Sequence, residues 1–231
     1  MEPAETIRTA VAAVSRLRVQ TTASSSLLEA VKKIKLFQAK RFRSTYADLL
    51  VSGEYGPATQ FFLDELYSDK DFAQRDAQFA KIAGALQSFF PKQVVNTAVT
   101  LATLHRLTEE LDHQMAIEIQ FASGTDEARK YVQAWNSVGR RSDRELQLKT
   151  VLSVGLELER LTRTPGLRLM LKMMRRPAHA AGLGALQVFL EAGFDTFAAM
   201  SGRKKLVNSF LSTIDERESN LIQELFSPNV E

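Results

Sequence analysis

Few residues of this chain combine the types and spacing that chemistry requires, and the clearest of them are histidines. Glu110 and His113 form an E-x-x-H pair, the spacing with which one helix supplies ligands to ferritin-like di-iron sites, where both side chains project into the interior of a bundle. At about 100° per residue, His113 lies opposite the apolar stripe that includes Leu104 and Leu111, and no second E-x-x-H pair occurs. We therefore expect Glu109 and His113 to interact on a solvated helix face, and we predict no metal site.

His105 lies on the flank of the same apolar stripe. From there a neutral imidazole can ligate haem or a metal ion from one side. The chain has three histidines in all, so the alternative is a structural histidine whose ring nitrogens are satisfied by hydrogen bonds. His105 is thus a candidate cofactor ligand, and the sequence does not identify the cofactor.

Two charged residues, Arg75 and Asp76, fall within or beside the apolar stripe of the helix predicted from Asp71 to Phe90. A buried ion is tolerated only when it is paired and hydrogen-bonded, so we predict an interhelical network that includes both residues. A polar ligand pocket is the alternative. The core-facing positions of this helix are Phe72, Phe79, Ile82, Ala83, Leu86 and Phe90.

Glu159 is a similar case, because it falls on the apolar face marked by Leu148 and Leu152. We expect it to form a structural salt bridge with an arginine. The candidate partners are Arg75, Arg160 and Arg163. Catalysis would require carboxylates to converge, and sequence alone does not show which side chains converge.

Two basic surfaces stand out although the formal net charge is only +3. One is the solvent face of the helix that follows Ser26, where cations surround an exposed Leu36; the other is a short amphipathic helix at 165–176, within a stretch from Leu161 to Leu190 that contains no acid. Such helices bind anionic membranes or acidic partners, or simply cover a core. The cations are Lys32, Lys33, Lys40 and Arg43 on the first surface and Arg168, Lys172, Arg175 and Arg176 on the second.

The elements that must position these residues are helices. Apolar residues recur with the helical period, and no stretch shows sustained alternation with period two. Ser26 and Glu29 form a capping box, Asp71 suits an N-cap, and Pro91 suits a first turn. We predict an all-α, bundle-like domain of about nine or ten helices without a β-sheet. The first predicted helix ends near residue 21. The others span about 26–51, 57–67, 71–90, 91–121, 125–140, 143–163, 165–176, 183–200 and 203–226.

We predict that residues 1–25 form an N-terminal helix and linker and that residues 26–231 form one helical domain. A sub-boundary near Gly124 is the alternative. Amphipathic helices end on both sides of that glycine and need partners to cover them, which favours one continuous assembly. The C-terminal helix carries a stripe that can pack internally or against a second subunit, formed by Val207, Phe210, Ile214, Leu221 and Leu225.

Composition argues against several classes of function. The chain has no cysteine, which removes disulfides and thiol catalysis and suits a reducing cytoplasm. Lys and Arg number 30 against 27 for Asp and Glu, and aromatic residues do not interleave with the basic ones, which disfavours nucleic acid as a partner. We expect neither a secretory signal nor a transmembrane helix, and the sequence contains no P-loop or catalytic triad motif. We expect a cytoplasmic protein, and the sequence favours a role without catalysis.

A distinctive motif with the pattern FFLxELYxxKDFxxRDAQF occupies residues 61–79. With it the chain resembles an uncharacterised family of conserved bacterial proteins. The resemblance extends to the helix from Leu104 to Met115 and to residues 184–187 and 193–197, so it covers most of the chain. It implies a bacterial cytosolic setting and carries over no activity, cofactor or partner.

The sequence is consistent with three functions. The leading hypothesis is a non-catalytic helical adaptor or regulatory protein that acts through contacts with a protein partner or with a second copy of the chain. The second is a helical protein that binds haem, a metal or another cofactor through His105. The third is reversible attachment to an anionic membrane through the basic helix at 165–176.

Overall fold

The computed structural model describes residues 1–65, 70–201 and 204–227, and in these ranges it contains twelve α-helices and no strand. The predicted all-α fold is therefore confirmed. Tyr67, the turn at 68–69 and the break at Gly202 lie outside the described residues. The helices are α1 (Pro3–Thr22), α2 (Ser25–Thr45), α3 (Ala47–Leu50), α4 (Gly56–Glu65), α5 (Ala73–Phe89), α6 (Lys92–Glu118), α7 (Glu127–Val138), α8 (Arg141–Thr162), α9 (Leu167–Met173), α10 (Arg175–Ala180), α11 (Gly184–Ser201) and α12 (Lys204–Phe226).

The start of α2 differs from the predicted capping box. The Ser24 hydroxyl accepts a hydrogen bond from the backbone N–H of Leu27 at 3.3 Å, so Ser24, and not Ser26, is the N-cap. Because α1 continues to Thr22, the connection between the two helices is shorter than the linker that we predicted. An N-cap serine satisfies an amide that would otherwise lack a partner in the first turn.

The helix predicted at 165–176 is in fact two short helices. The chain bends at Met174, between α9 and α10, and Pro177 lies in the first turn of α10. The sequence predicts a break at Pro177, but a proline in the first turn of a helix removes only an N–H that has no helical partner. Gly166 has a φ of 77°, which other residues rarely adopt and which turns the chain from α8 into α9.

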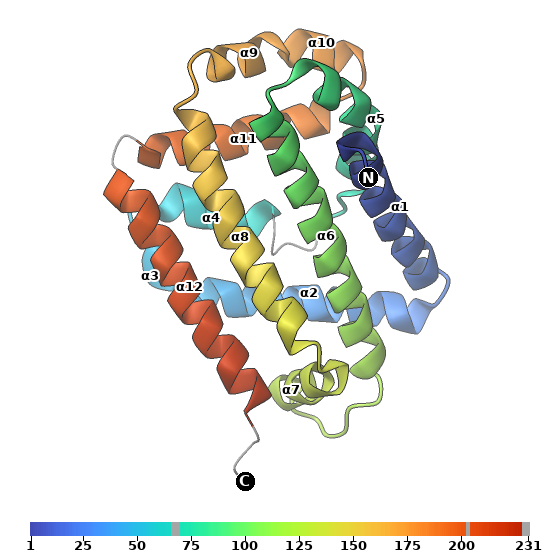
Figure 1. Ribbon diagram of the computed structural model, residues 1–231. Coiled ribbons are helices and arrows are strands. Elements are labelled where there is room, and N and C mark those ends of the chain that lie inside the picture. Colours follow the sequence, from blue (N-terminus) through green and yellow to red (C-terminus); the bar gives the residue numbers. More distant parts are fainter. Residues whose placement is uncertain (66–69, 202–203, 228–231) are drawn as a thin grey trace.

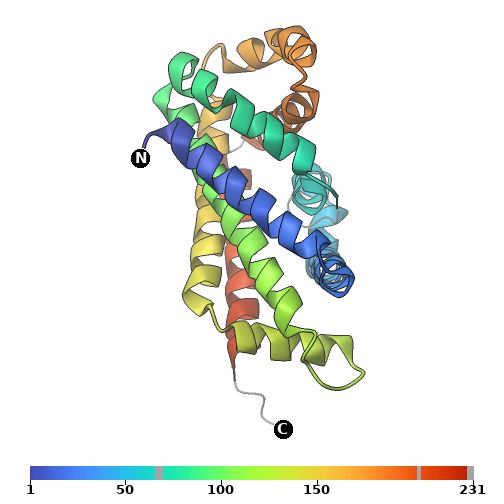
Figure 2. The same ribbon diagram turned by 90° about the vertical axis from the view of Figure 1, so that its right-hand side faces the viewer.

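The long helices form two layers. Figure 1 shows α6, α8 and α12 running along the length of the molecule, with α1 beside α6. The turned view in Figure 2 shows α2, α4 and α11 nearly end-on to one side of these helices, so they form a second layer whose helices cross the first. Helices α9 and α10 cover one end of the molecule, and α7 lies at the other. No helix in the described part of the chain has both the length and the apolar character that crossing a bilayer requires.

The apolar core is divided into three clusters. The first joins the end of α2 to α3, α4, α11 and α12 around Phe42, Phe197 and Phe210. The second joins α2, α6, α7 and α12, and the third joins α1, α5 and α6. Val207, Phe210 and Ile214 of the predicted C-terminal stripe are buried within the first cluster.

Candidate functional site

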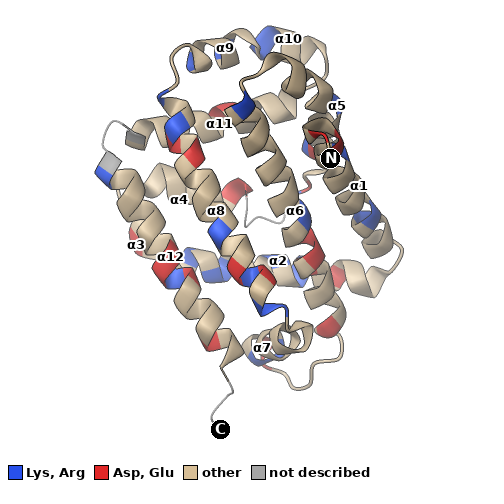
Figure 3. Ribbon diagram, in the orientation of Figure 1, with Lys and Arg blue, Asp and Glu red and all other residues tan. Residues whose placement is uncertain are grey.

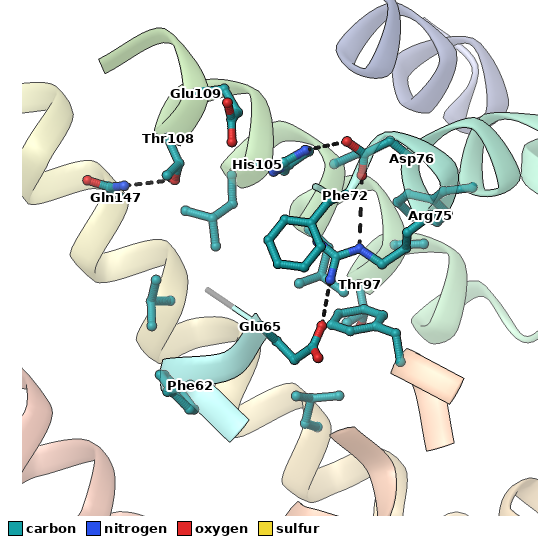
Figure 4. Close-up of a pocket in the computed structure, with 18 of the residues that line it drawn as sticks. Phe62, Glu65, Phe72, Arg75, Asp76, Thr97, His105, Thr108, Glu109 and Gln147 are labelled. Carbon is teal, nitrogen blue, oxygen red and sulfur yellow. Dashed lines mark hydrogen bonds and ion pairs between the residues drawn. The ribbon is translucent and has the colours of Figure 1, made fainter. Parts of the chain in front are cut away.

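A cavity of about 570 Å³ lies between the two layers of helices. This volume is within the range of small-molecule sites, roughly 300 to 1,000 Å³. Most side chains at its wall are aliphatic or aromatic, and the lining residues come from eleven of the twelve described helices. They include Phe62, Phe72, Leu101, Leu148, Val151 and Leu190. Figure 4 shows that charged and hydrogen-bonding groups gather on the walls formed by α4, α5 and α6. The cavity thus combines an apolar interior with localised polar groups.

Asp76 is the centre of the polar wall. This carboxylate is only 4% exposed. The Arg18 guanidinium of α1 donates to it at 2.6 Å, and the His105 imidazole of α6 donates at 2.8 Å (Figure 4 shows His105 and Asp76). The Nε atom of Arg75 lies 4.0 Å from its other oxygen. Three helices are therefore joined through one buried carboxylate.

The electrostatics of Asp76 follow from this arrangement. Burial raises the pKa of the carboxyl group, but the hydrogen bond and charge of His105, followed by those of Arg18, outweigh burial, and the pKa lies below its ordinary value. A carboxylate held ionised in the interior by cationic donors is stable only while those donors stay in place. The wall is consequently sensitive to the loss of any one member.

Arg75 connects this network to α4. Its guanidinium donates to Glu65 at 2.8 Å and lies 3.9 Å from the centre of the Phe72 ring and 4.4 Å from that of Phe189. Burial lowers the pKa of Arg75, against the raising effects of Asp76 and Glu65. The guanidinium is thus held by a carboxylate and by two aromatic ring faces, both of which attract a cation.

A second polar group lies further along α6. Lys35 of α2 forms an ion pair with Glu109 at 2.6 Å, and the Gln38 amide donates to Asp112 at 2.9 Å. Burial raises the pKa of Asp112 above its ordinary value, although the charge of Lys35 opposes this shift. At the facing wall, the Gln147 amide of α8 donates to the Thr108 hydroxyl at 2.7 Å (Figure 4).

Two further polar contacts belong to the wall. Glu218 of α12 accepts hydrogen bonds from Arg41 at 2.5 Å and from the Tyr46 hydroxyl at 2.8 Å. Trp135 of α7 also lines the cavity. Its buried indole N–H has no acceptor among the described residues.

The sequence-predicted site residues do not all meet. Arg75, Asp76 and His105 come together on the cavity wall. Glu159 is not at the cavity; it is buried on α8 and forms an ion pair with Arg163. The side chains of the two basic surfaces are exposed, namely Lys32, Lys33, Lys40, Arg43, Arg168, Lys172, Arg175 and Arg176.

The prediction of a solvated Glu109–His113 face was wrong. His113 is half-buried, and its Nδ1 lies 3.1 Å from the Thr21 hydroxyl of α1, while Glu109 is paired with Lys35 of α2. Burial lowers the pKa of His113, against the charge of Glu109. Helices α1 and α2 pack on this side of α6 and bury polar residues that helical phase alone places toward solvent.

His105 is engaged by the protein itself, since its Nε2 lies against Asp76. Among the described residues, no group of three or more His, Asp or Glu side chains is arranged to hold a metal ion. A metal or haem at this nitrogen would have to displace the Asp76 hydrogen bond. The observed geometry is that of a positioning contact between α5 and α6.

Sequence reasoning missed the partners of the network, above all Arg18, Glu65 and Glu218. For Arg18 a signal exists, because it continues the spacing of Ile7, Val11 and Val14 along the buried side of α1. Glu218 likewise follows Ile214 by four residues on the buried side of α12. Charged residues on apolar stripes therefore indicate more members of the polar wall than the sequence analysis singled out.

Comparison with known proteins complements this geometry. Neither the curated proteins nor the solved structures yield a significant match to the chain. A family model described as a domain of unknown function (DUF8198) matches residues 17–231. That range holds Arg18 and every other residue of the charged wall described above. The chain therefore belongs to the DUF8198 family, a family of domains of unknown function.

Proposed function

We propose that the chain binds a predominantly apolar small molecule in the cavity between its two helical layers. The observation that carries this proposal is a hollow of about 570 Å³, lined mainly by aliphatic and aromatic side chains, beside a network of buried charges. An unfilled apolar space of this size costs packing energy, because its lining side chains lose van der Waals contacts. A ligand would restore them.

The charges at the wall favour a neutral ligand. Arg75 is paired with Glu65, Lys35 with Glu109, and Arg41 with Glu218. A ligand carboxylate would have to compete with these protein carboxylates while losing its own hydration. A neutral carbonyl or hydroxyl oxygen loses less hydration on burial and does not compete for these ion pairs.

Binding can be tested with the neutral fluorophore N-phenyl-1-naphthylamine, which brightens in apolar surroundings. We expect saturable binding to the purified chain. The variant Leu101→Trp places a larger side chain at the cavity wall and should weaken binding roughly tenfold or more, because it fills the space that the probe needs.

The matched control is Leu146→Trp, which makes the same exchange at an exposed position of α8 away from the cavity. It should bind the probe as the parent chain does. Equal binding by the two variants, or no saturable binding at all, would overturn the proposal. Circular dichroism and thermal melting establish that both variants are folded.

The adaptor function predicted from the sequence is a second proposal, and the exposure of Leu36 favours it. This leucine is 53% exposed on α2 among Lys32, Lys33 and Lys40. Aliphatic side chains surrounded by cations suit an acidic, partly apolar protein surface. A monomer in solution that recovers no stoichiometric partner from native lysate would count against it.

We infer a bacterial cytoplasmic setting for both proposals. The support is the resemblance of residues 61–79 to a family of bacterial proteins and the absence of cysteine from the sequence. Localisation of a tagged chain in a bacterial host by cell fractionation tests this. Recovery from the periplasm would contradict it.

A further inference from the structure

The end of the molecule formed by α9 and α10 exposes apolar and cationic side chains together. Leu169 is 63% exposed and Met173 is 70% exposed, and they lie on one side of α9 at a spacing of four residues. None of the residues of α9 is buried. Isolated exposed apolar residues are common, but two neighbouring ones on a short helix at the end of the molecule form a small apolar patch.

The charge around this patch is positive. From Leu161 to Leu190 the chain has no acidic residue, and Figure 3 shows basic and no acidic segments along α9 and α10. Arg168 and Arg175 are balanced by Asp195 and Glu191 of α11. That leaves a surplus of cations at this end of the molecule.

Three cations make up the surplus, Lys81, Lys172 and Arg176. None of them forms an ion pair with a described carboxylate, although the charge of Lys172 is felt by Glu191. Lys81 of α5 donates to the backbone carbonyl of Ala181 at the end of α10. All three side chains are exposed. An anionic surface complements such a set of cations.

The inner side of the same segment closes the cavity. Leu167, Met170, Leu171 and Met174 line the hollow, while Leu169 and Met173 point to solvent. Helix α9, which lies at this end of the molecule (Figure 1), therefore has one side at the cavity and the other in solvent. Helix α9 is joined to α11 by the hydrogen bond that the Gln187 amide donates to the Leu171 carbonyl at 2.7 Å, among other contacts.

We propose that α9 and α10 dock on an anionic lipid bilayer, inserting Leu169 and Met173 among the lipids while Lys172, Arg176 and Lys81 contact the headgroups. One part of this inference rests on the proposed function: the ligand of the cavity would be a neutral lipid taken from the bilayer. The docking itself is a separate property of the outer surface. Amphipathic cationic segments bind such interfaces reversibly.

Flotation with vesicles tests the docking. The chain is mixed with vesicles of phosphatidylcholine alone or of equal parts phosphatidylcholine and phosphatidylglycerol. We expect flotation with the anionic vesicles that weakens as salt is raised, because salt screens the headgroup charge. Absence of flotation, or equal flotation with both kinds of vesicle, would overturn the proposal.

Two double variants locate the surface. Leu169→Gln with Met173→Gln removes the apolar contact, and Lys172→Gln with Arg176→Gln removes the charge. Each should lower the partition coefficient by roughly tenfold. All four positions are exposed, so the variants should fold. Unchanged flotation of both would overturn the proposal.

Matched controls come from the basic surface of α2. Leu36→Gln removes an exposed apolar side chain, and Lys32→Gln with Lys40→Gln removes two exposed cations. These variants should float as the parent chain does, and an equal loss in the controls would contradict docking through α9 and α10. The cavity variant Leu101→Trp should also keep its flotation. If the parent chain floats with anionic vesicles but does not bind the neutral fluorophore, docking is supported and the proposed ligand function fails.

Discussion

The first apolar cluster and the cavity are built from the same kinds of side chain and share Phe42, Phe62 and Ile214, yet the part of the cluster around Phe197 is filled and the cavity beside it is hollow. Helix α11 contributes to both: Phe197 is fully buried in the cluster, whereas Phe189 and Leu190 line the cavity. Apolar composition therefore does not decide which region closes. The difference lies in what surrounds the apolar residues.

In the filled region the helices approach closely. A Cβ atom added to Gly155 of α8 would lie 2.7 Å from Cδ2 of Leu211 on α12. Around the cavity, by contrast, paired charges such as Arg75 and Glu65 occupy the wall. Collapse of the wall would separate these ions from their partners, at a cost that opposes filling of the space.

The largest effect should come from truncation in the filled region. Phe197→Ala should destabilise the chain by about 3 to 5 kcal/mol, because it opens a new void in a close-packed cluster. Leu101→Ala, on the wall of an existing hollow, should cost less than about 2 kcal/mol. Urea denaturation measures both. Equal losses would show that the two regions are packed alike.

The second effect concerns the polar wall. Asp76→Asn leaves Arg18 and Arg75 without their shared carboxylate and should cost about 2 kcal/mol near neutral pH, less than for a fully buried pair because Arg18 is partly exposed. The folded pKa of Asp76 is lowered from 3.8, so its contribution is present above that pH and is lost as pH falls through the lower folded value. The difference between parent and variant should narrow at acid pH, as followed by denaturation at several pH values; a constant difference would contradict this account.

The close approach at Gly155 predicts a smaller change in stability on substitution, and its sign should depend on the side chain at residue 211. Gly155→Ala should destabilise the chain by about 1 kcal/mol, since crowding against Leu211 exceeds the gain in helix propensity. In a Leu211→Ala background, where the crowding is absent, the same exchange should be stabilising. A double-mutant cycle measured by thermal unfolding decides the matter.

The smallest effect is expected at the surface of the filled region, where Asp48 of α3 pairs with Arg217 of α12 at 2.7 Å. The hydrogen bond from Arg217 lowers the pKa of Asp48 from 3.8 to about 2. Its stabilisation is present above pH 3.8 and disappears as pH falls toward 2. Because Asp48 is exposed, Asp48→Asn should cost less than about 1 kcal/mol. NMR titration of the carboxyl group checks the pKa, and an unshifted value would contradict the pair.

Local patterns in the sequence predicted the helices well, because apolar period, caps and glycine breaks act within a few residues. Helical phase also placed Asp76 on the buried side of its helix, where it is found. The same reasoning failed at His113, since nothing near it in sequence reveals that α1 and α2 cover that side. The split at Met174 was missed because a proline can begin a helix as readily as end one.

The cavity could not be predicted from sequence. Its wall joins residues as distant as Arg41 and Glu218, whose pairing depends on how whole helices cross. Whether apolar side chains fill a space depends on distances between helices, and sequence patterns describe single helices only. The charges on apolar stripes indicated that partners exist without identifying them.

The position of helix α6 predicts how fast its backbone amides exchange with solvent in the native state. It contributes Ala98 and Ala102 to one apolar cluster and Met115 and Ala116 to another, with the cavity wall between them. Its middle amides should therefore exchange only when the whole chain unfolds. The amides of α9, which has no buried residue, should exchange many times faster through local opening. The end of the molecule nearest the proposed membrane surface should therefore open locally while the central helix stays folded.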